Sequence, residues 1–187
     1  MGTAMPILET ERLIIRPFRL DDVDRIAQVR SVDDADENRR YIAGSIASGE
    51  YLASLGQPPY GDRAVVRKAD DRLIGAVGLV PCLMPFDQLG CFSSGHPPQT
   101  IQPNTTEVGL YWELDPAYRR QGYATEAARA LIAFAFQTLR LKRIVANTNY
   151  DNVASQGVMR KLGMTIDHNL LPEPEWFQVV GILENDM

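Results

Sequence analysis

The sequence predicts a mixed α/β fold, in which helices flank a central sheet of parallel and antiparallel strands. Short β-branched runs alternate with segments of helical periodicity along the chain. The runs at 64–67 and 73–80 are separated only by a polar turn, which is typical of a hairpin, whereas a helical pattern at about 122–139 lies between two strand-like runs and predicts a crossover. Hairpins combined with a crossover favour a mixed sheet over a purely parallel one.

Composition narrows the class of protein. The chain has 187 residues, of which 45% are hydrophobic and 23% charged, with a net charge of -5. These values predict a single domain over 1–187 and exclude disorder as its main property. The acidic balance argues against nucleic acid as a partner, and without an apolar run of roughly 20 residues we expect no membrane span and a cytoplasmic location. Cys82, Cys91 and His96 are too few ligands for a zinc site, so no metal is expected.

The first half of the chain begins with a strand and two helices. Alternation and β-branched residues predict one strand over 8–16, ended by Pro17. A helical spacing over 20–31 follows two aspartates that can cap it. The helical pattern at 35–54 is weaker because it contains two glycines.

A long loop is expected at 81–105, where five prolines interrupt any period. Such a loop is either a functional lid or a surface insertion. Phe86, Phe92 and His96 lie in it with Asp87 as the only acid, which favours an apolar or neutral amine-bearing partner. His96 is also a possible but unsupported base.

The clearest strand covers 106–115, because its residues alternate in type. One face carries Val108, Leu110, Trp112 and Leu114, and the other carries Glu107, Gly109, Tyr111 and Glu113.

The C-terminal third predicts a helix, a strand, a second helix and a final strand pair. The first helix, about 122–139, has an apolar face of Ala124, Ala127, Ala128, Leu131, Phe134, Ala135 and Thr138. A strand at 143–148 leads to Asn152, a candidate cap for a helix that runs to about Leu162 and stops at Gly163. Segments 165–168 and 177–183 are expected to pair.

The segment 115–127 carries the chemistry. Between Pro116 and Thr125 it holds two arginines and no acid, at a strand end, a turn and a helix start. The first turn of a helix has unpaired backbone N–H groups and partial positive charge, and so can bind a phosphate. Gly122 lets the backbone approach a ligand, and Ala124 keeps the next position small. The alternative is an ordinary capped helix with a solvated basic turn.

At this point a family resemblance is visible. The chain resembles the GCN5-related N-acetyltransferase (GNAT) superfamily, within it the branch typified by ribosomal-protein alanine and serine N-acetyltransferases. The matching segments are ETERLIIRP at 9–17, LIGAVGL at 73–79, TEVGLYWELDPAYRRQGYATEAARALIAFAF at 106–136, and NVASQGVMRKLGM at 152–164.

The resemblance implies a GNAT-like acyl-CoA acyltransferase fold that binds acetyl-CoA as co-substrate. The family's turn, which cradles the pyrophosphate, matches Arg119, Arg120, Gln121, Gly122, Tyr123 and Ala124. The strand beside the pantetheine arm matches Trp112, Glu113 and Leu114, with a backbone N–H near Leu114 facing the thioester carbonyl. Asn152 matches an asparagine that reaches the coenzyme arm, and Ser155 either shares that task or only caps and packs the helix.

The implied reaction is attack of a primary amine on the thioester. Glu107 is our candidate base, and the alternative is an exposed strand-edge glutamate. At the position where some relatives have a glutamate, this chain has Asn147. At the position where they have a tyrosine that protonates the leaving thiolate, the register places Met159 or Arg160. The proton for the leaving thiolate therefore comes from Ser155, from Tyr150 or Tyr111, or from water.

The sequence thus predicts an N-acetyltransferase that acts on a peptide N-terminus or a small amine, as a monomer or homodimer. The alternative is an acyl-CoA-binding regulatory module with weak or no turnover.

Overall fold

The computed structural model describes residues 6–93 and 99–186, so His96 lies outside the described residues. The chain forms two compact units, one of Met1–Val80 with Tyr111–Leu139 and the other of Pro81–Leu110 with Arg140–Met187. Strands β4 (Arg72–Met84) and β5 (Thr105–Leu114) contribute residues to both units. The single domain expected from the sequence stays a prediction, and each unit is described by itself.

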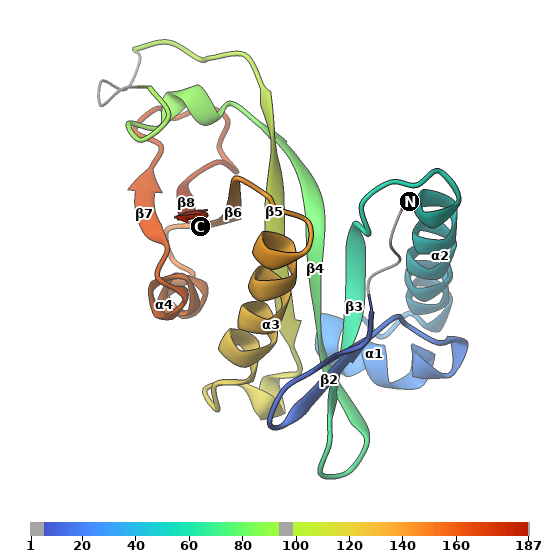
Figure 1. The fold of residues 1–187 in the computed structure, drawn as a ribbon. Coiled ribbons are helices and arrows are strands. Elements are labelled where there is room, and N and C mark those ends of the chain that lie inside the picture. Colours follow the sequence, from blue (N-terminus) through green and yellow to red (C-terminus); the bar gives the residue numbers. More distant parts are fainter. Residues whose placement is uncertain (1–5, 94–98, 187) are drawn as a thin grey trace. The chain divides into compact units, whose positions relative to one another are not determined.

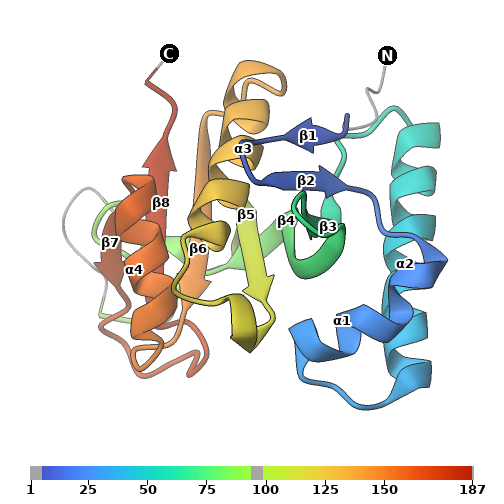
Figure 2. The same ribbon diagram turned by 90° about the horizontal axis from the view of Figure 1, so that it is seen from below.

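The first unit is an antiparallel sheet with three α-helices. Its strands are ordered β1-β2-β3-β4, and each pairs antiparallel with the next. Figure 2 shows α1 and α3 on opposite sides of these strands. Besides β4 and the end of β5, the unit contains β1 (Leu8–Glu9), β2 (Leu13–Arg16), η1 (Leu20–Asp22), α1 (Val23–Arg30), α2 (Ala35–Ser54), β3 (Gly61–Arg67), η3 (Pro116–Tyr118) and α3 (Tyr123–Gln137).

The core of this unit lies where α1 and α2 pack against β3 and β4. Its members are apolar and almost wholly shielded from solvent: Phe18, Ile26, Val29, Ile42, Ala64, Val66, Leu73 and Ala76. The 20-residue helix α2 runs unbroken through both of its glycines, because Asp34 caps its start and Ile42 anchors it in this core. Tertiary packing thus offsets the low helix propensity of glycine.

The second unit contains the parallel pairing of the fold. Strand β5 runs parallel to β6 (Arg143–Thr148), with Gly109 opposite Val145. Strand β8 (Val179–Glu184) pairs antiparallel with β6 on one side and with β7 (Thr165–His168) on the other. Helix α4 (Val153–Leu162) contacts β6 and β7, as Figure 1 shows. Antiparallel and parallel pairings therefore both occur, and the predicted mixed α/β class is confirmed.

Two sequence expectations were wrong at strand boundaries. The single strand expected over 8–16 is two antiparallel strands, β1 and β2, separated by residues 10–12, of which 11 and 12 form a bend. The loop expected from 81 begins later, because β4 continues to Met84 through the exposed Pro81. A proline in a strand is tolerated where its missing N–H would face solvent.

The aromatic residues of the 81–105 segment include core residues of the second unit. Phe86 is fully buried, in the short helix η2 (Phe86–Gln88), and its ring lies 5.2 Å from Phe92 and 5.8 Å from Phe177 between centroids. Gln88 is also fully buried and donates to the side chain of Asn169. Residues 86–88 therefore pack into the second unit, and Phe86 does not form an exposed aromatic surface for a substrate.

The helices of the C-terminal third match their predictions closely. In α3, Ala127, Ala128, Leu131, Phe134 and Ala135 are buried as expected, whereas Thr138 is exposed and Ala124 is half-buried. Gly163 ends α4 in a left-handed conformation at φ 82°. Among the described residues, no helix combines the length and the apolar character needed to cross a membrane.

Candidate functional site

An exposed turn joins β5 to α3 in the first unit. Asp115 is buried directly after β5, and its Oδ1 accepts from the N–H of Ala117 at 2.9 Å, which starts η3. The next residues, 119–122, are all exposed. Arg120 and Gly122 both have left-handed backbone conformations, at φ 61° and 85°. The second of these is inexpensive only for glycine, which explains this residue at the helix start.

The N-terminus of α3 has no side-chain cap of its own. Gly122 is the N-cap, and its carbonyl accepts the first helical hydrogen bond from Glu126 N at 3.0 Å. By contrast, Asn152 caps α4 through its side chain. The first N–H groups of α3 thus lie next to an exposed turn, an arrangement suited to an anion.

Side chains of the turn also tie it to its surroundings. Nε of Arg119 donates to the carbonyl of Leu114 at 3.1 Å, and Nε2 of Gln121 donates to the carbonyl of Ala117 at 3.1 Å. Because the partner of Arg119 is a carbonyl rather than a carboxylate, this bond does not neutralise its positive charge. The bond also links the turn directly to the last residue of β5.

The remaining predicted coenzyme residues of this unit differ in exposure. Leu114 and Tyr123 are buried, at 9% and 7% exposure, while Trp112 and Ala124 are half-buried. The centroid of the Tyr123 ring lies 6.4 Å from that of the Tyr118 ring, so the aromatic side chains on either side of the turn pack against each other.

A half-buried polar cluster that the sequence did not reveal lies in the same unit. Tyr41 donates its hydroxyl proton to Oδ2 of Asp62 at 2.7 Å, and Tyr111 donates to Glu113 at 2.5 Å. Burial, strengthened by the negative charge of Glu113, raises the pKa of Asp62 despite the hydrogen bond from Tyr41. Tyr41, Asp62 and the strand that carries Tyr111 and Glu113 are too far apart in sequence for any spacing motif to show this cluster. Burial also raises the pKa of Tyr111, which therefore stays protonated.

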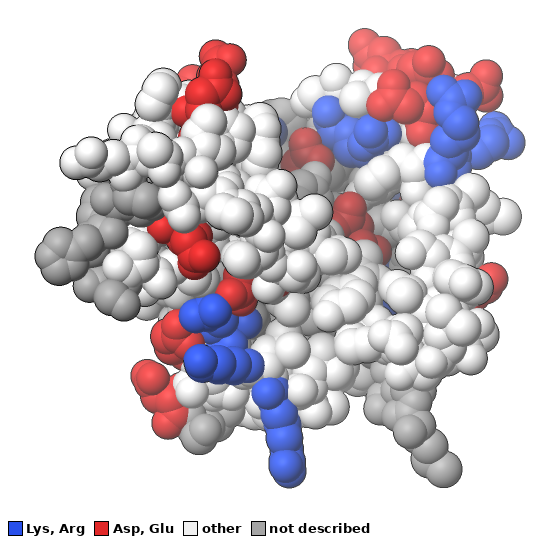
Figure 3. All heavy atoms as spheres, turned by 90° about the horizontal axis from the view of Figure 1, so that it is seen from above, with Lys and Arg blue, Asp and Glu red and all other residues white. Residues whose placement is uncertain are grey.

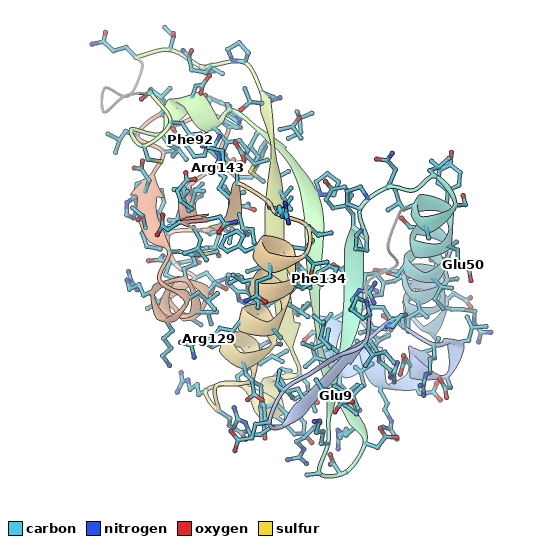
Figure 4. The ribbon with its side chains drawn as sticks, viewed as in Figure 1. Glu9, Glu50, Phe92, Arg129, Phe134 and Arg143 are labelled. Carbon is cyan, nitrogen blue, oxygen red and sulfur yellow. The ribbon has the colours of Figure 1, made fainter. Side chains whose placement is uncertain are left out.

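In the second unit, the candidate base Glu107 is part of an ion pair. Arg143 donates to Oε1 of Glu107; the Glu107 side chain is 13% exposed and that of Arg143 is 27% exposed. This hydrogen bond is the main reason that the pKa of Arg143 is raised. The guanidinium also lies over the ring of Phe92, 4.5 Å from its centroid, and both residues are labelled in Figure 4. Glu107 is therefore not exposed, and its role as the base stays a prediction.

The start of α4 shows capping in atomic detail. Oδ1 of Asn152 accepts from the N–H of Ser155 at 3.1 Å. Tyr150, one of the alternative acids, donates its hydroxyl proton to the carbonyl of Asn169 at 2.6 Å. Met159 is fully buried and packs in the core. The capping role of Asn152 is thus observed, and the coenzyme roles of Asn152 and Ser155 stay predictions.

The site residues predicted from the sequence divide between the two units. The first unit brings together Trp112, Leu114 and the turn 119–124, whereas Glu107, Asn152 and Ser155 belong to the second. Within 6–93 and 99–186, His, Cys, Asp and Glu form no group of three or more that could hold a metal ion. On the face drawn in Figure 3, basic side chains among the coloured residues lie in small groups, most of them beside acidic ones. Among the coloured residues of this face there is therefore no broad basic surface.

Comparisons with known proteins agree with this geometry. Residues 12–165 match the family described as acetyltransferase (GNAT) domain. The chain is 29% identical over 162 residues to the uncharacterized N-acetyltransferase YnaD of Bacillus subtilis, covering 84% of this chain and 81% of the relative.

Solved structures show the same fold. A GNAT-family acetyltransferase from Bacillus anthracis superposes with a TM-score of 0.69 at 18% identity, covering 97% of this chain and all of the other. RimL, a ribosomal L7/L12 alpha-N-protein acetyltransferase in complex with coenzyme A, gives a TM-score of 0.62 at 16% identity, covering 95% of this chain and 96% of the other. From the family match over most of its length, the chain belongs to the GNAT acetyltransferase family and is an acetyl-CoA-dependent N-acetyltransferase.

Proposed function

We propose that this enzyme transfers the acetyl group of acetyl-CoA to the primary amine of a peptide N-terminus or of a small molecule. The observation that carries the proposal is the exposed turn at 119–122, with two left-handed residues and an uncapped helix start behind it. The ribosomal-protein acetyltransferases among the structures of the same fold support the peptide N-terminus as a substrate class.

The coenzyme would be held mainly through its phosphates. Arg119 and Arg120 supply positive charge, and the backbone from Gln121 through Tyr123 to Ala124 supplies N–H groups at the helix start. A Cβ atom at Gly122 would lie 3.4 Å from NH2 of Arg12, and the φ of 85° at this position strains any residue other than glycine. These features fit a pyrophosphate.

The reactive end of the coenzyme is assigned from the family resemblance. Trp112 and Leu114 would flank the pantetheine arm, and the N–H near Leu114 would donate to the thioester oxygen as negative charge develops on it. Asn152, beyond its observed capping bond, is proposed to donate its amide N–H groups to the same arm.

The reaction forms one N–C bond and breaks one C–S bond. The amine nitrogen attacks the thioester carbonyl, one proton leaves the nitrogen, and coenzyme A departs as a thiolate. An α-amine, with a pKa of about 8, is far less protonated at neutral pH than a lysine amine at about 10.4. A peptide N-terminus therefore depends less on a strong base than a lysine side chain does.

Glu107 is proposed as the proton acceptor, directly or through water. Arg143 holds its Oε1, so the proton would go to Oε2. The ion pair fixes the orientation of the Glu107 carboxylate. A base of this kind suits a substrate amine that is already partly deprotonated in solution.

The proposal is tested by calorimetric titration with acetyl-CoA and by thiol release with a panel of peptides and amines. Gly122→Glu places a carboxylate in the phosphate turn and should abolish binding and turnover. Gly44→Glu is the matched control, because Gly44 is exposed on α2 with nothing within 4 Å of its Cβ position.

Three outcomes separate the possibilities. Loss of binding in Gly122→Glu alone, with amine-dependent thiol release by the wild type, supports the proposal. Equal acetyl-CoA binding by Gly122→Glu, Gly44→Glu and the wild type would overturn the assignment of the turn. Binding without release for any amine would favour the regulatory module.

A further inference from the structure

A clamp of three residues joins the N-terminal segment to the first turn of α3, next to the exposed turn at 119–122. Thr10 and Arg12 lie between β1 and β2, and both bind Glu126 of α3. Arg12 and Glu126 are 114 positions apart in the sequence. Two of the three clamp residues thus lie in the segment 10–12, which interrupts the single strand expected from the sequence.

Both oxygens of the Glu126 carboxylate are engaged. Oε1 accepts from the Thr10 hydroxyl at 2.6 Å and from the Arg12 backbone N–H at 3.0 Å. Oε2 accepts from Nε of Arg12 at 2.6 Å and lies 2.6 Å from its NH2. Burial by itself would raise the pKa of Glu126, but these hydrogen bonds outweigh burial and lower it. The carboxylate is therefore ionised at neutral pH.

The same guanidinium contacts Gln121 and Tyr123 and lies close to Gly122 between them. NH1 of Arg12 donates to the carbonyl of Gln121 at 3.1 Å, and NH2 lies 3.4 Å from the Cβ position of Gly122. The guanidinium carbon also lies over the ring of Tyr123, 4.3 Å from its centroid. Because the turn contains left-handed residues, such an external brace keeps it in one conformation.

The position of Glu126 raises an electrostatic problem that Arg12 solves. A carboxylate in the first helical turn is close to the N–H groups that would bind a phosphate, and like charges at that distance repel. Arg12 neutralises Glu126 and holds its carboxylate toward the β1–β2 bend. The positive charges of Arg119 and Arg120 then remain available to an anion.

From these contacts we propose that Arg12 is a positioning residue for coenzyme A: it braces Gln121, Gly122 and Tyr123 and neutralises the Glu126 carboxylate at the phosphate-binding end of α3. The inference rests on the proposed function of this turn. It goes beyond it by assigning to a distant N-terminal residue the conformation and charge of the coenzyme site.

The test measures the dissociation constant of coenzyme A by calorimetry, with the melting temperature of each variant as a stability readout. Arg12→Ala should weaken binding about tenfold, the size of one partly screened charge interaction at a helix N-terminus. Glu126→Gln should bind as tightly as the wild type. The double variant Arg12→Ala/Glu126→Gln should recover part of the affinity that Arg12→Ala loses, because it removes the unpaired carboxylate but does not restore the brace. If Arg12→Ala does not fold, Arg12→Gln takes its place.

Arg16→Ala is the matched control for a loss of stability without a loss of coenzyme binding. Arg16 lies in β2 and makes a two-point ion pair with Asp22, at 2.7 and 2.8 Å, away from the turn. It should melt at a lower temperature and bind coenzyme A like the wild type.

A purely structural clamp predicts a different pattern. In that case Arg12→Ala and Glu126→Gln weaken binding equally and the double variant recovers nothing, which would overturn the inference. Wild-type affinity in Arg12→Ala would overturn it as well. Absence of coenzyme A binding by the wild type itself would instead overturn the proposed function.

Discussion

Replacing Gly75 by alanine should lower both turnover and stability. Gly75 is buried in β4, beside the end of β5 that is expected to hold the thioester. An added Cβ would lie 2.5 Å from the carbonyl oxygen of Glu113 and 3.5 Å from Cα of Leu114, and it would overlap the Leu114 side chain. Ordinary contact requires about 3.5 Å, so the end of β5 must move by roughly 1 Å.

The expected magnitudes follow from that displacement. Overpacking of this kind typically costs about 1–3 kcal/mol of unfolding free energy. A shift of about 1 Å at the reacting groups can lower kcat about 100-fold. Because the proposed oxyanion donor is the N–H near Leu114, most of the loss should appear in kcat and little in the KM for the amine.

The assay compares kcat from thiol release with the melting temperature in two variants. Gly78→Ala is the matched control, because its Cβ would lie 2.6 Å from Oδ1 of Asp62 and 2.7 Å from the carbonyl of Gly61, against β3 rather than β5. Both variants should lose similar stability, and only Gly75→Ala should lose kcat. Equal kcat losses in the two, or an unchanged kcat in Gly75→Ala, would refute the reasoning.

Three further predictions concern single groups. Glu107→Gln should lower kcat about 100-fold at neutral pH if the carboxylate accepts the proton, while full activity in a thiol-release assay would remove it as the base. Asp22→Asn should cost about 3 kcal/mol at neutral pH, because it removes the charged partner of Arg16, whose side chain is only 11% exposed. Burial tends to raise the pKa of Asp22, but the hydrogen bonds from Arg16 and from the Arg19 backbone lower it, so this stabilisation is present above about pH 3.9 and is lost as the pH falls through the folded-state pKa. In denaturant titrations the gap between wild type and Asp22→Asn should therefore shrink on acidification, and a constant gap would contradict the assignment. Gln88→Ala should cost about 3 kcal/mol because it removes a buried amide and its bond to Asn169, and a melting temperature like that of the wild type would show that this contact is dispensable.

The sequence indicated most where local patterns determine local structure. Strands β6 and β7 have the predicted bounds, and α4 begins after its Asn152 cap and ends at Gly163 as expected. The charge and glycine pattern of 119–122 also indicated the turn, because a left-handed position and a helix start leave marks in the sequence itself.

The features that sequence reasoning missed depend on contacts between distant segments. The alternating pattern of 8–16 fits one strand as well as two strands separated at 10–12. The separation depends on Glu126 in α3, which binds Thr10 and the backbone of Arg12. Phe86 looked like a loop aromatic, yet it is buried against Phe177 near the other end of the chain. The pairing of Glu107 with Arg143 likewise follows from the parallel pairing of β5 and β6, which no local pattern specifies.

The most direct test of the central claim is amine-dependent release of the coenzyme A thiol at neutral pH. Wild type and Gly122→Glu would be compared with a peptide that has a free N-terminus and with an N-terminally blocked peptide that has one lysine. The account predicts rapid release by the wild type with the free N-terminus, slower release with the lysine peptide and none by Gly122→Glu. Equal release by Gly122→Glu, or no release by a wild type that binds acetyl-CoA, would contradict it.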